Sequence, residues 1–392
     1  MSEKFITANN YCREVFDGTH DTPKPSDYGY KLVTSKNIIG NTLDLNSAYL
    51  ISQEDYLAIN KRSKVSQFDV LFSMIGSVGN VYIEQRKNEE IDYSIKNIGV
   101  FSSKTEKEAY WLYYYLQSPY AQSFIKKFLN GAVQKFLPLQ TLRAFPILSP
   151  VENYESIISI LKNIDQKIAL NNQINEELEA MAKTLYDYWF VQFDFPNENG
   201  KPYKSSGGKM VYNDQLKREI PEGWGVKQLG ELDVATGKRD ANFGTENGQY
   251  DFWTTANEPI KADEYSFEGK AILIAGNGNF YINFTEGKFE AYQRTYVIQS
   301  ADENELLFMY PACLQSIEKL RKGSNGSIIK YITIGDVQNI SQPHCPVVAK
   351  MFVDIFRPIM NTIQKNKQQN QELTQLRDWL LPMLMNGQVK VE

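Results

Sequence analysis

Residues 168–185 read IALNNQINEELEAMAKTL, and residues 363–380 read IQKNKQQNQELTQLRDWL. At a constant offset of 195, residues of the first stretch recur in the second: Ile168, Asn171, Asn175, Glu177, Leu178 and Leu185 return as Ile363, Asn366, Asn370, Glu372, Leu373 and Leu380. Repetition at a fixed offset indicates a duplicated structural unit. The chain is therefore expected to contain the same helix twice.

Both stretches belong to longer heptad seams. Apolar residues alternate steps of four and three from Ile157 to Trp189, and again from Phe352 to Leu384, with two asparagines in the middle of each seam. An Asn in such a seam lowers stability but fixes the register of the paired helices. The residues expected to pair the two helices are Ile164, Ile168, Asn171, Asn175, Leu178, Ile359, Ile363, Asn366, Asn370 and Leu373.

An antiparallel pair is favoured, because residues 196–345 must lead from the end of the first helix back to the start of the second. Asn171 would then lie near Asn370 and Asn175 near Asn366, although the seam alone also permits a parallel pair. Pro358 is expected to kink the second helix, and Pro382 to end or bend it. The alternative interpretation is two ordinary amphipathic core helices.

Shorter repeats precede each helix. Gly79-Asn80-Val81-Tyr82-Ile83 resembles residues 278–282, residues 34–37 resemble residues 254–257, and residues 130–132 resemble residues 325–327. Their common order, globular half and then helix in both copies, predicts an α+β fold in which two pseudo-symmetric α/β domains are separated by two long antiparallel coiled-coil helices. The expected boundaries are domain one at 1–150, the first helix at 151–195, an exposed linker at 196–220, domain two at 221–345, and the second helix with the C-terminal tail at 346–392.

Composition narrows the class of protein. Of 392 residues, 42% are hydrophobic and 23% charged, which is typical of globular proteins and excludes wholesale disorder. No apolar run reaches the 18 or so residues of a membrane span, and no signal-peptide core follows Met1. Three scattered cysteines and two histidines predict a reduced, cytoplasmic protein without a structural metal site. The net charge of −5 permits a DNA partner but predicts weak non-specific affinity for the chain alone.

Catalytic motifs are missing from the sequence. There is no G-x-x-x-x-G-K-[ST] phosphate loop and no H-E-x-x-H. Glu268-Gly-Lys270 and Glu286-Gly-Lys288 match half of a metal-dependent nuclease site, yet no Pro-Asp pair precedes them, so hairpin turns are the better interpretation. No catalytic residue and no metal ligand is therefore predicted. A nuclease or methyltransferase with an unrecognised active site remains the alternative function, and a coiled-coil scaffold that does not bind DNA is a third.

Polar loop residues suited to DNA remain. Asn and Gln can pair with adenine edges, Arg and Lys with guanine, and Ser or Thr with phosphates. For any one of them, a solvated surface position is the simpler explanation. The candidate DNA-binding residues are Thr19, His20, Lys24, Lys36, Asn37, Asn80, Asn97, Gln134, Lys135, Lys238, Arg239, Thr255, Asn257, Asn277, Asn279, Arg294, Asn325, Ser327 and Lys330.

Three further motifs carry a family resemblance. They are Ile220-Pro-Glu-Gly-Trp224 with Gln228-Leu-Gly-Glu-Leu232, Trp189-Phe-Val-Gln-Phe193 with Asn199-Gly-Lys-Pro-Tyr203, and Leu380-Leu-Pro-Met-Leu-Met-Asn-Gly-Gln388. With the duplicated layout, the whole chain resembles the specificity (DNA-recognition) subunit of type I restriction-modification systems. The first half departs from the pattern, because it begins without its own I-P-E-G-W.

The resemblance implies a non-catalytic subunit of a hetero-oligomer. Each domain would read one half of a split double-stranded DNA target, and the helices would set the unread spacer and dock two modification (methyltransferase) subunits. Restriction (translocase and nuclease) subunits would complete the complex. S-adenosylmethionine, ATP and Mg are expected on those partners, with no cofactor in this chain.

Overall fold

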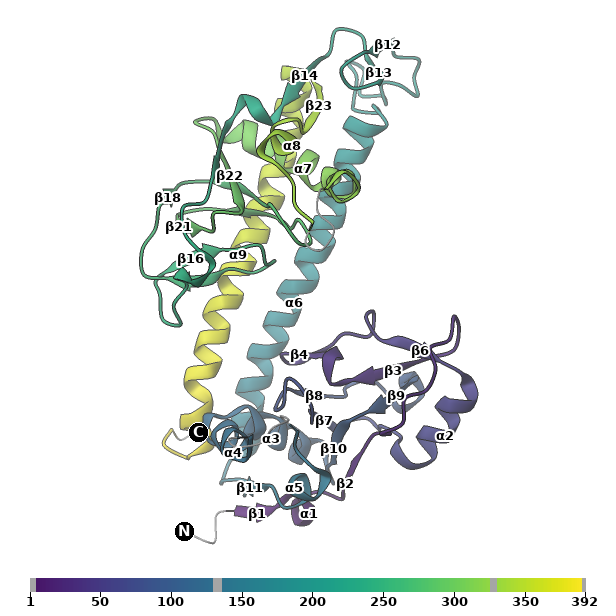
Figure 1. The fold of residues 1–392 in the computed structure, drawn as a ribbon, viewed down its shortest axis with the longest axis vertical. Helices are drawn as coiled ribbons and strands as arrows, with labels where there is room; N and C mark the ends of the chain where they lie inside the picture. Colours follow the sequence, from purple (N-terminus) through teal and green to yellow (C-terminus); the bar gives the residue numbers. More distant parts are fainter. Residues whose placement is uncertain (1–4, 130–135, 325–329, 390–392) are drawn as a thin grey trace. The chain divides into compact units, whose positions relative to one another are not determined.

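The computed structural model describes residues 5–129, 136–324 and 330–389 (Figure 1). The chain divides into two compact units. The first unit comprises Met1–Leu170 and Gln368–Glu392, and the second unit comprises Asn171–Lys367. Each unit therefore contains one globular half of the sequence together with parts of two long helices.

The long helices are α6 (Tyr154–Tyr186), extended by a π-helical turn (Asp187–Val191), and α9 (Pro346–Met385). In the first unit, Leu161 shares a core with Leu384, and the carboxylate of Asp165 lies 2.9 Å from the guanidinium of Arg377. Early residues of α6 thus meet late residues of α9. The two segments of the first unit run antiparallel, as predicted.

The second unit gives the same result. The Asn366 side-chain amide donates to the Asn175 side-chain oxygen at 2.8 Å, and Tyr186 packs against Phe352 with ring centroids 6.2 Å apart. As residue numbers rise along α6, those of the facing α9 residues fall. The predicted meeting of Asn175 with Asn366 is confirmed. All ten residues predicted to pair the helices are buried or half-buried.

Both prolines lie within α9. The helix α9 continues through Pro358 and past Pro382 to Met385. Pro358 still accepts a side-chain bond through its carbonyl oxygen, from the Thr362 hydroxyl at 2.8 Å. Pro382 lies in the last turn of α9, where the sequence predicts that the helix ends or bends, because the missing N–H of proline removes one hydrogen bond.

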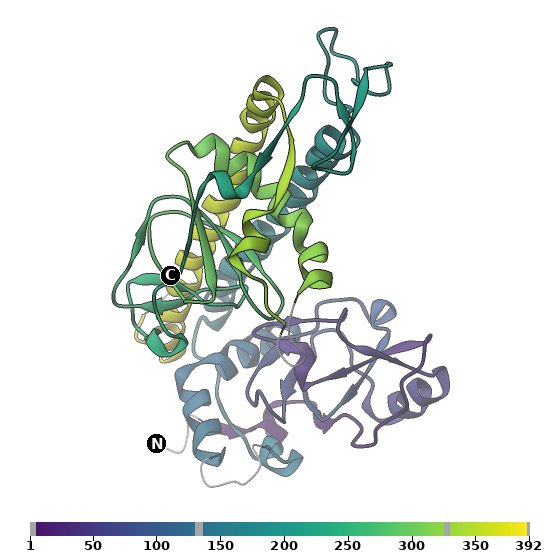
Figure 2. The same cartoon turned by 45° about the horizontal axis from the view of Figure 1, so that its top comes forward.

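The first unit carries two sheets that lie beside its helix segments, to the right of them in Figure 1, and that are also seen in Figure 2. A four-stranded antiparallel sheet has the order β2-β10-β7-β8, and a three-stranded sheet has the order β6-β3-β9, in which β3 and β9 are parallel. The strands are β1 (Phe5–Thr7), β2 (Glu14–Asp17), β3 (Tyr30–Thr34), β4 (Ile38–Ile39), β5 (Thr42–Leu43), β6 (Tyr49–Ile51), β7 (Val70–Ser73), β8 (Val81–Ile83), β9 (Tyr93–Lys96), β10 (Ile98–Ser102) and β11 (Pro146–Leu148). The helices are α1 (Ala8–Tyr11), α2 (Gln53–Ser63), α3 (Glu106–Gln117), α4 (Pro119–Leu129) and α5 (Leu139–Arg143), with 3-10 turns at Ser35–Asn37 and Asn88–Glu90.

The second unit repeats this topology. Its antiparallel sheet has the order β15-β22-β19-β20, and its other sheet has the order β17-β16-β21-β18, in which β16 and β21 are parallel. The strands are β12 (Met210–Asn213), β13 (Arg218–Pro221), β14 (Gly225–Gln228), β15 (Asp233–Thr236), β16 (Tyr250–Trp253), β17 (Ile260–Ala262), β18 (Phe267–Glu268), β19 (Ala271–Ala275), β20 (Ile282–Thr285), β21 (Lys288–Ala291), β22 (Thr295–Gln299) and β23 (Ser341–His344). The helices are α7 (Glu303–Gly323) and α8 (Ile334–Gln338), with 3-10 turns at Leu229–Glu231 and Ala241–Phe243.

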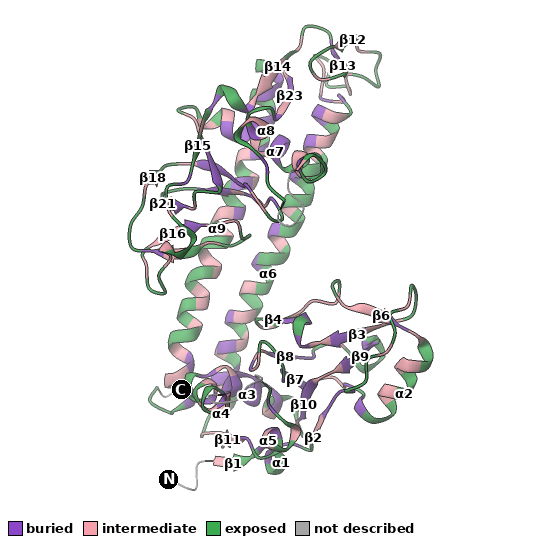
Figure 3. Cartoon of the chain, viewed as in Figure 1, coloured by how far each residue is buried: buried purple, intermediate pink, exposed green. Residues whose placement is uncertain are grey.

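Register shows how closely the units correspond. Gly99 pairs with Asp17 on one side and Phe72 on the other, and Tyr296 pairs in the same way with Thr236 and Ile274. The central strands of both sheets are almost wholly buried (Figure 3). The predicted pseudo-symmetry of the two halves is confirmed at the level of single residue pairs.

The structure corrects one repeat by two residues: the sequence pairs Gly79 with Gly278, whereas the fold pairs Gly79 with Phe280. The Ser73 amide donates to Asn80, and the Ala275 amide donates to Tyr281, both at 2.9 Å, so Asn80 corresponds to Tyr281 and Gly79 to Phe280. Both Gly79 and Phe280 have a positive φ, of 100° and 54°. A bulky residue is rarely found in that conformation, which explains why matching glycine to glycine misaligned the repeat.

The segment expected to be an exposed linker, 196–220, is partly packed. It includes most of the β12–β13 hairpin, and its Ile220 is buried in the core of the second unit. The ring of Tyr203 stacks on Phe195 at 4.8 Å between centroids. Apolar side chains between the Gly, Ser and Asn residues therefore bind this connection to the second unit, which composition alone did not indicate.

Candidate nucleic-acid interface

A loop cluster in the first unit brings together the end of β2 and the turn from β9 to β10. Thr19 forms a parallel bridge with Lys96, and the Gly18 amide donates to Ile98 at 2.9 Å. A Cβ atom on Gly18 would lie 2.4 Å from the carbonyl oxygen of Ile95, so only glycine fits. Residues 17–20 and 96–98 are called here the first loop cluster.

His20 is the best-anchored polar side chain of the first loop cluster. Its Nε2 lies 3.0 Å from the Asp17 carboxylate and its Nδ1 lies 2.8 Å from the Asn97 side-chain oxygen, while 57% of the side chain stays exposed. Asn97 adopts a positive φ of 54°. Two contacts from separate elements thus fix an exposed imidazole. His20 and Asn97 are predictable from the sequence as polar loop residues, whereas Asp17 is not, because only the fold brings its carboxylate to the ring.

Other predicted residues of the first unit are placed differently. Asn37 is buried, and its side-chain oxygen accepts from the backbone and hydroxyl of Thr34. The Asn80 side chain donates to the Ile38 carbonyl at 3.0 Å. These contacts give Asn37 and Asn80 structural roles. Thr19 is buried, whereas Lys24 and Lys36 are exposed.

The equivalent place in the second unit is the second loop cluster, residues 236–240 and 291–295. Arg239 forms a parallel bridge with Tyr292, and the Gly237 amide donates to Thr295 at 2.9 Å. Both the Lys238 amide, at 3.0 Å, and the Arg239 amide, at 3.3 Å, donate to Ala291. Two residues opposite one form a bulge, a feature that redirects side chains at sheet edges.

The cations of the second loop cluster are not equivalent. The Arg239 guanidinium contacts the buried Glu290 carboxylate at 3.2 Å and Glu264 at 2.7 Å, so its charge is neutralised within the protein. Lys238 is exposed, with its ammonium 5.3 Å from the centre of the Phe267 ring. Arg294 is exposed beside a hollow of about 290 Å³ that is also lined by Gly276, Gln293, Tyr296 and Ile332.

The remaining predicted residues of the second unit surround this cluster. Asn277 forms a bridge with Tyr331, and the Asn279 amide donates to the Tyr281 hydroxyl at 3.1 Å. Thr255 is half-buried, while Asn257 and Lys330 are exposed. Four predicted residues lie outside the described residues: Gln134, Lys135, Asn325 and Ser327.

The two glycine turns that resemble half of a nuclease site have structural partners. Glu268 pairs with Lys288 across β18 and β21, and the amides of Gly269 and Gly287 each donate to the other's carbonyl at 2.9 and 3.1 Å. Lys270 forms an ion pair with Glu303 at 2.6 Å. No group of three or more His, Cys, Asp or Glu that could hold a metal ion occurs among the described residues.

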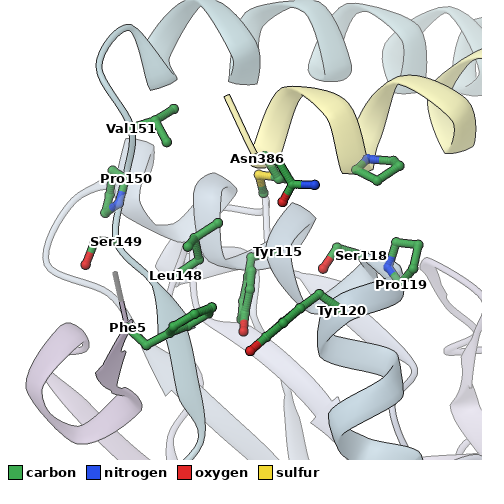
Figure 4. Close-up of a pocket in the computed structure, with 12 residues that line it drawn as sticks. Phe5, Tyr115, Ser118, Pro119, Tyr120, Leu148, Ser149, Pro150, Val151 and Asn386 are labelled. Carbon is green, nitrogen blue, oxygen red and sulfur yellow. The ribbon is translucent and has the colours of Figure 1, made fainter. Parts of the chain in front are cut away.

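A larger hollow in the first unit offers packing surface more than chemistry. It measures about 630 Å³ and lies against the end of α9 near Asn386 (Figure 4). Tyr115 and Tyr120 supply its phenols, and the Tyr115 hydroxyl already donates to the Pro146 carbonyl at 2.6 Å. The ring of Phe5 stacks on Tyr120 at 5.1 Å. This lining holds no acid–base pair or nucleophile arranged for catalysis.

No helix of the described residues is long and apolar enough to cross a membrane. The chain is similar, over 97% of its length and 96% of the other chain, to the crystal structure of the S subunit of a type I restriction-modification system from M. genitalium, with a TM-score of 0.55 and 14% sequence identity. At this identity the likeness establishes the fold only.

Sequence comparisons identify relatives that are named as specificity subunits. The chain is 28% identical over 311 residues to the Type I restriction enzyme MjaIX specificity subunit of Methanocaldococcus jannaschii. The aligned region covers 72% of this chain and 69% of that protein. It is 34% identical over 180 residues to the Type I restriction enzyme EcoDI specificity subunit of Escherichia coli, covering 44% of this chain and 40% of that protein.

A family model spans both halves. The model for the type I restriction modification DNA specificity domain matches residues 14–180 and 221–375, that is, each globular half with part of the helix that follows it. This duplicated match coincides with the duplicated fold. The resemblance noted in the sequence is confirmed: the chain belongs to the type I restriction-modification DNA specificity family.

Proposed function

We propose that this chain is the DNA-recognition subunit of a type I restriction-modification complex, and that each unit reads one half of a bipartite target through its loop cluster. The observation that carries the proposal is that both units build a corresponding loop cluster with two equivalent backbone bonds: Gly18 to Ile98 matches Gly237 to Thr295, and Asn97 to Thr19 matches Gln293 to Arg239. Gly18 and Gly237 occupy the same position, yet the side chains around them differ. A shared scaffold with unlike polar side chains suits two domains that read two different half-sites.

The covalent chemistry is assigned to partner subunits. Methyl transfer would come from two modification subunits that bind S-adenosylmethionine, and ATP-driven, Mg-dependent cleavage from restriction subunits. The exposed faces of the long helices are the surfaces on which the modification subunits would dock.

Domain exchange tests independent readout. Residues 222–345 would be replaced by the corresponding domain of another family member, and the complex with modification subunits would then be used to map methylated sites by sequencing. We expect one half of the target to change and the other half to stay. The control is the reciprocal exchange of residues 14–150, which should change the opposite half. If either exchange altered both halves, independent readout would be refuted.

DNA binding itself is tested by salt dependence. The full chain with its modification subunits should bind duplex DNA with a log affinity that falls linearly with log salt concentration, because phosphate contacts release counterions. A purified complex that shows no salt-dependent binding to any duplex, while still containing this chain, would rule out the recognition role and favour a scaffold. Cleavage or methyl transfer by the chain alone would instead favour the enzyme alternative.

A further inference from the structure

The turn between the two sheets is one residue longer in the second unit. Ile98 opposes Ser73 in the first unit, and Thr295 opposes Ala275 in the second, so Ile98 and Thr295 correspond. The bridging residues before them are Lys96 and Tyr292. Asn97 alone fills the interval in the first unit, whereas Gln293 and Arg294 fill it in the second.

Backbone bonds decide which of the two residues is additional. The Asn97 amide donates to Thr19 at 3.1 Å, and the Gln293 amide donates to Arg239 at 2.9 Å. Because Thr19 and Arg239 are the two bridging residues, Gln293 takes the place of Asn97. Arg294 is therefore an insertion in the second loop cluster, with no counterpart in the first.

Charge pairing distinguishes Arg294 from Arg239, Lys261 and Lys270, although Lys238 of the same cluster also has no ion pair among the described residues and only a contact with the Phe267 ring. Arg239 is bound to Glu264 and Glu290, Lys261 lies 2.7 Å from Asp251, and Lys270 is bound to Glu303. Within the residues that the structure describes, the Arg294 side chain forms neither an ion pair nor a hydrogen bond, although its carbonyl accepts from the Gly276 amide at 2.7 Å. The backbone of Arg294 is thus fixed while all the N–H groups of its guanidinium remain available.

Arg294 lines a small hollow. The hollow of about 290 Å³ lies between Gly276, Gln293 and Tyr296. Tyr296 also lines the hollow, and its hydroxyl donates to the Ile332 carbonyl at 2.8 Å, so this phenol is already committed. The other polar side chains of the lining belong to Arg294 and Gln293, and both residues are exposed.

The first unit presents different chemistry at the same place. The Asn97 side chain is engaged by His20, and His20 is engaged by Asp17. The two half-sites would therefore be met by unlike groups: a tethered imidazole and amide in the first unit, and a free guanidinium in the second.

We propose that Arg294 is a specificity-determining residue of the second unit and reads a guanine through the N7 and O6 acceptors of its major-groove edge. Arginine forms two parallel hydrogen bonds with that edge, which no other base pair offers in the same arrangement. A phosphate contact would use the same charge but would carry no sequence information. The inference rests on the proposed function and names one base in one half-site.

The experiment compares the variants Arg294→Gln and Arg294→Lys with the control Lys322→Gln, which removes one exposed positive charge from α7 in the same unit. Each full-length chain would be assembled with its modification subunits and used to select bound sequences from a randomised duplex pool. Thermal unfolding of each variant would show that the fold is retained.

For Arg294→Gln we expect preference for guanine at one position of one half-site to fall roughly ten- to hundred-fold, with the other half-site unchanged. The control should keep the wild-type sequence preference. Arg294→Lys should retain part of the preference, because Lys can donate to the same acceptors without the paired geometry.

Two outcomes would overturn the inference. An equal loss of affinity for every sequence would make Arg294 a phosphate contact, and unchanged binding and preference would place it outside the interface. Both leave the proposed function standing, since the wild-type complex still selects a target. Failure of the wild-type complex to select any sequence would instead refute the proposed function itself.

Discussion

Asp69 illustrates how a single residue couples the fold to pH. It lies just before β7 with 3% of its surface exposed, and its carboxylate accepts from the Ser66 amide at 2.8 Å. Burial raises the pKa of Asp69 to about 6, against the opposing effects of hydrogen bonds from Ser102 and Ser66 and of the Arg13 charge. Because the folded pKa lies above the unfolded value, the folded state holds the proton more tightly.

The contribution of Asp69 to stability is complete below about pH 4 and is lost as pH rises through about 6. In the wild type, deprotonation of Asp69 should lower the free energy of unfolding by up to roughly 3 kcal/mol between pH 4 and pH 7. We expect Asp69→Asn to remove this loss. Urea unfolding of the full chain at intervals across this range would measure it. The exposed Asp44, whose pKa is lowered chiefly by its bond with Ser47, supplies the control Asp44→Asn, which should leave that loss in place. An Asp69→Asn protein with the wild-type pH profile would contradict the assignment.

At the scale of elements, polar contacts join each globular half to its long helix at matching positions. Lys162 of α6 binds Glu106 at the start of α3 at 3.0 Å, and Arg357 of α9 binds Glu303 at the start of α7 at 2.6 Å. Lys162 and Arg357 are related by the same offset of 195 that relates the two helices. Each globular half therefore forms an ion pair with its long helix at the corresponding position.

Another contact between elements is present in the first unit alone. Arg377 of α9 binds Asp165 of α6 at 2.9 Å, and the Tyr114 hydroxyl donates to the same carboxylate at 2.9 Å. At the offset of 195, the corresponding residues of the second unit are Met360 and Ala182, both buried in its core. The duplicated chain therefore contains both an ionic and an apolar version of one helix contact.

This difference predicts a non-additive result. Arg377→Ala should lower the free energy of unfolding by roughly 3 kcal/mol, because it leaves the half-buried Asp165 without its counter-charge. Adding Asp165→Met reproduces the pair of the second unit, and we expect most of the loss to be recovered. Urea unfolding of the wild type, both single variants and the double variant completes the cycle. Additive losses would show that the two side chains act independently.

At the scale of the whole molecule, sequence predicted what depends on periodicity. The heptad seam located both helices, and their asparagines predicted the register that joins Asn175 to Asn366. What depends on distant partners could not be predicted. Arg239 looked available for DNA until the fold brought Glu264 and Glu290 to it, and the positive φ of Phe280 hid a glycine-like position. Loop residues share no period, so only strand register revealed that Arg294 is an insertion.

The length of the long helices yields the last prediction. We propose that they set the number of unread base pairs between the half-sites. One added turn of four residues lengthens a helix by about 6 Å, and successive base pairs are about 3.4 Å apart. Inserting one turn after Gln173 of α6 and a matching turn after Gln368 of α9 should therefore lengthen the spacer by one or two base pairs. Methylated-site mapping with the assembled complex would read the spacer directly, with both half-sites unchanged.

The control for this experiment carries the insertion in α6 alone. It shifts one seam against the other, so that the facing positions of Asn175 and Asn366 no longer coincide, and it should lower the stability of the chain. The doubly inserted chain keeps the seams matched and should unfold at nearly the wild-type temperature. If that stable protein methylated sites with the original spacer, helix length would not determine the spacing, and the separation of the half-sites would have to originate in the loop clusters or in the partner subunits.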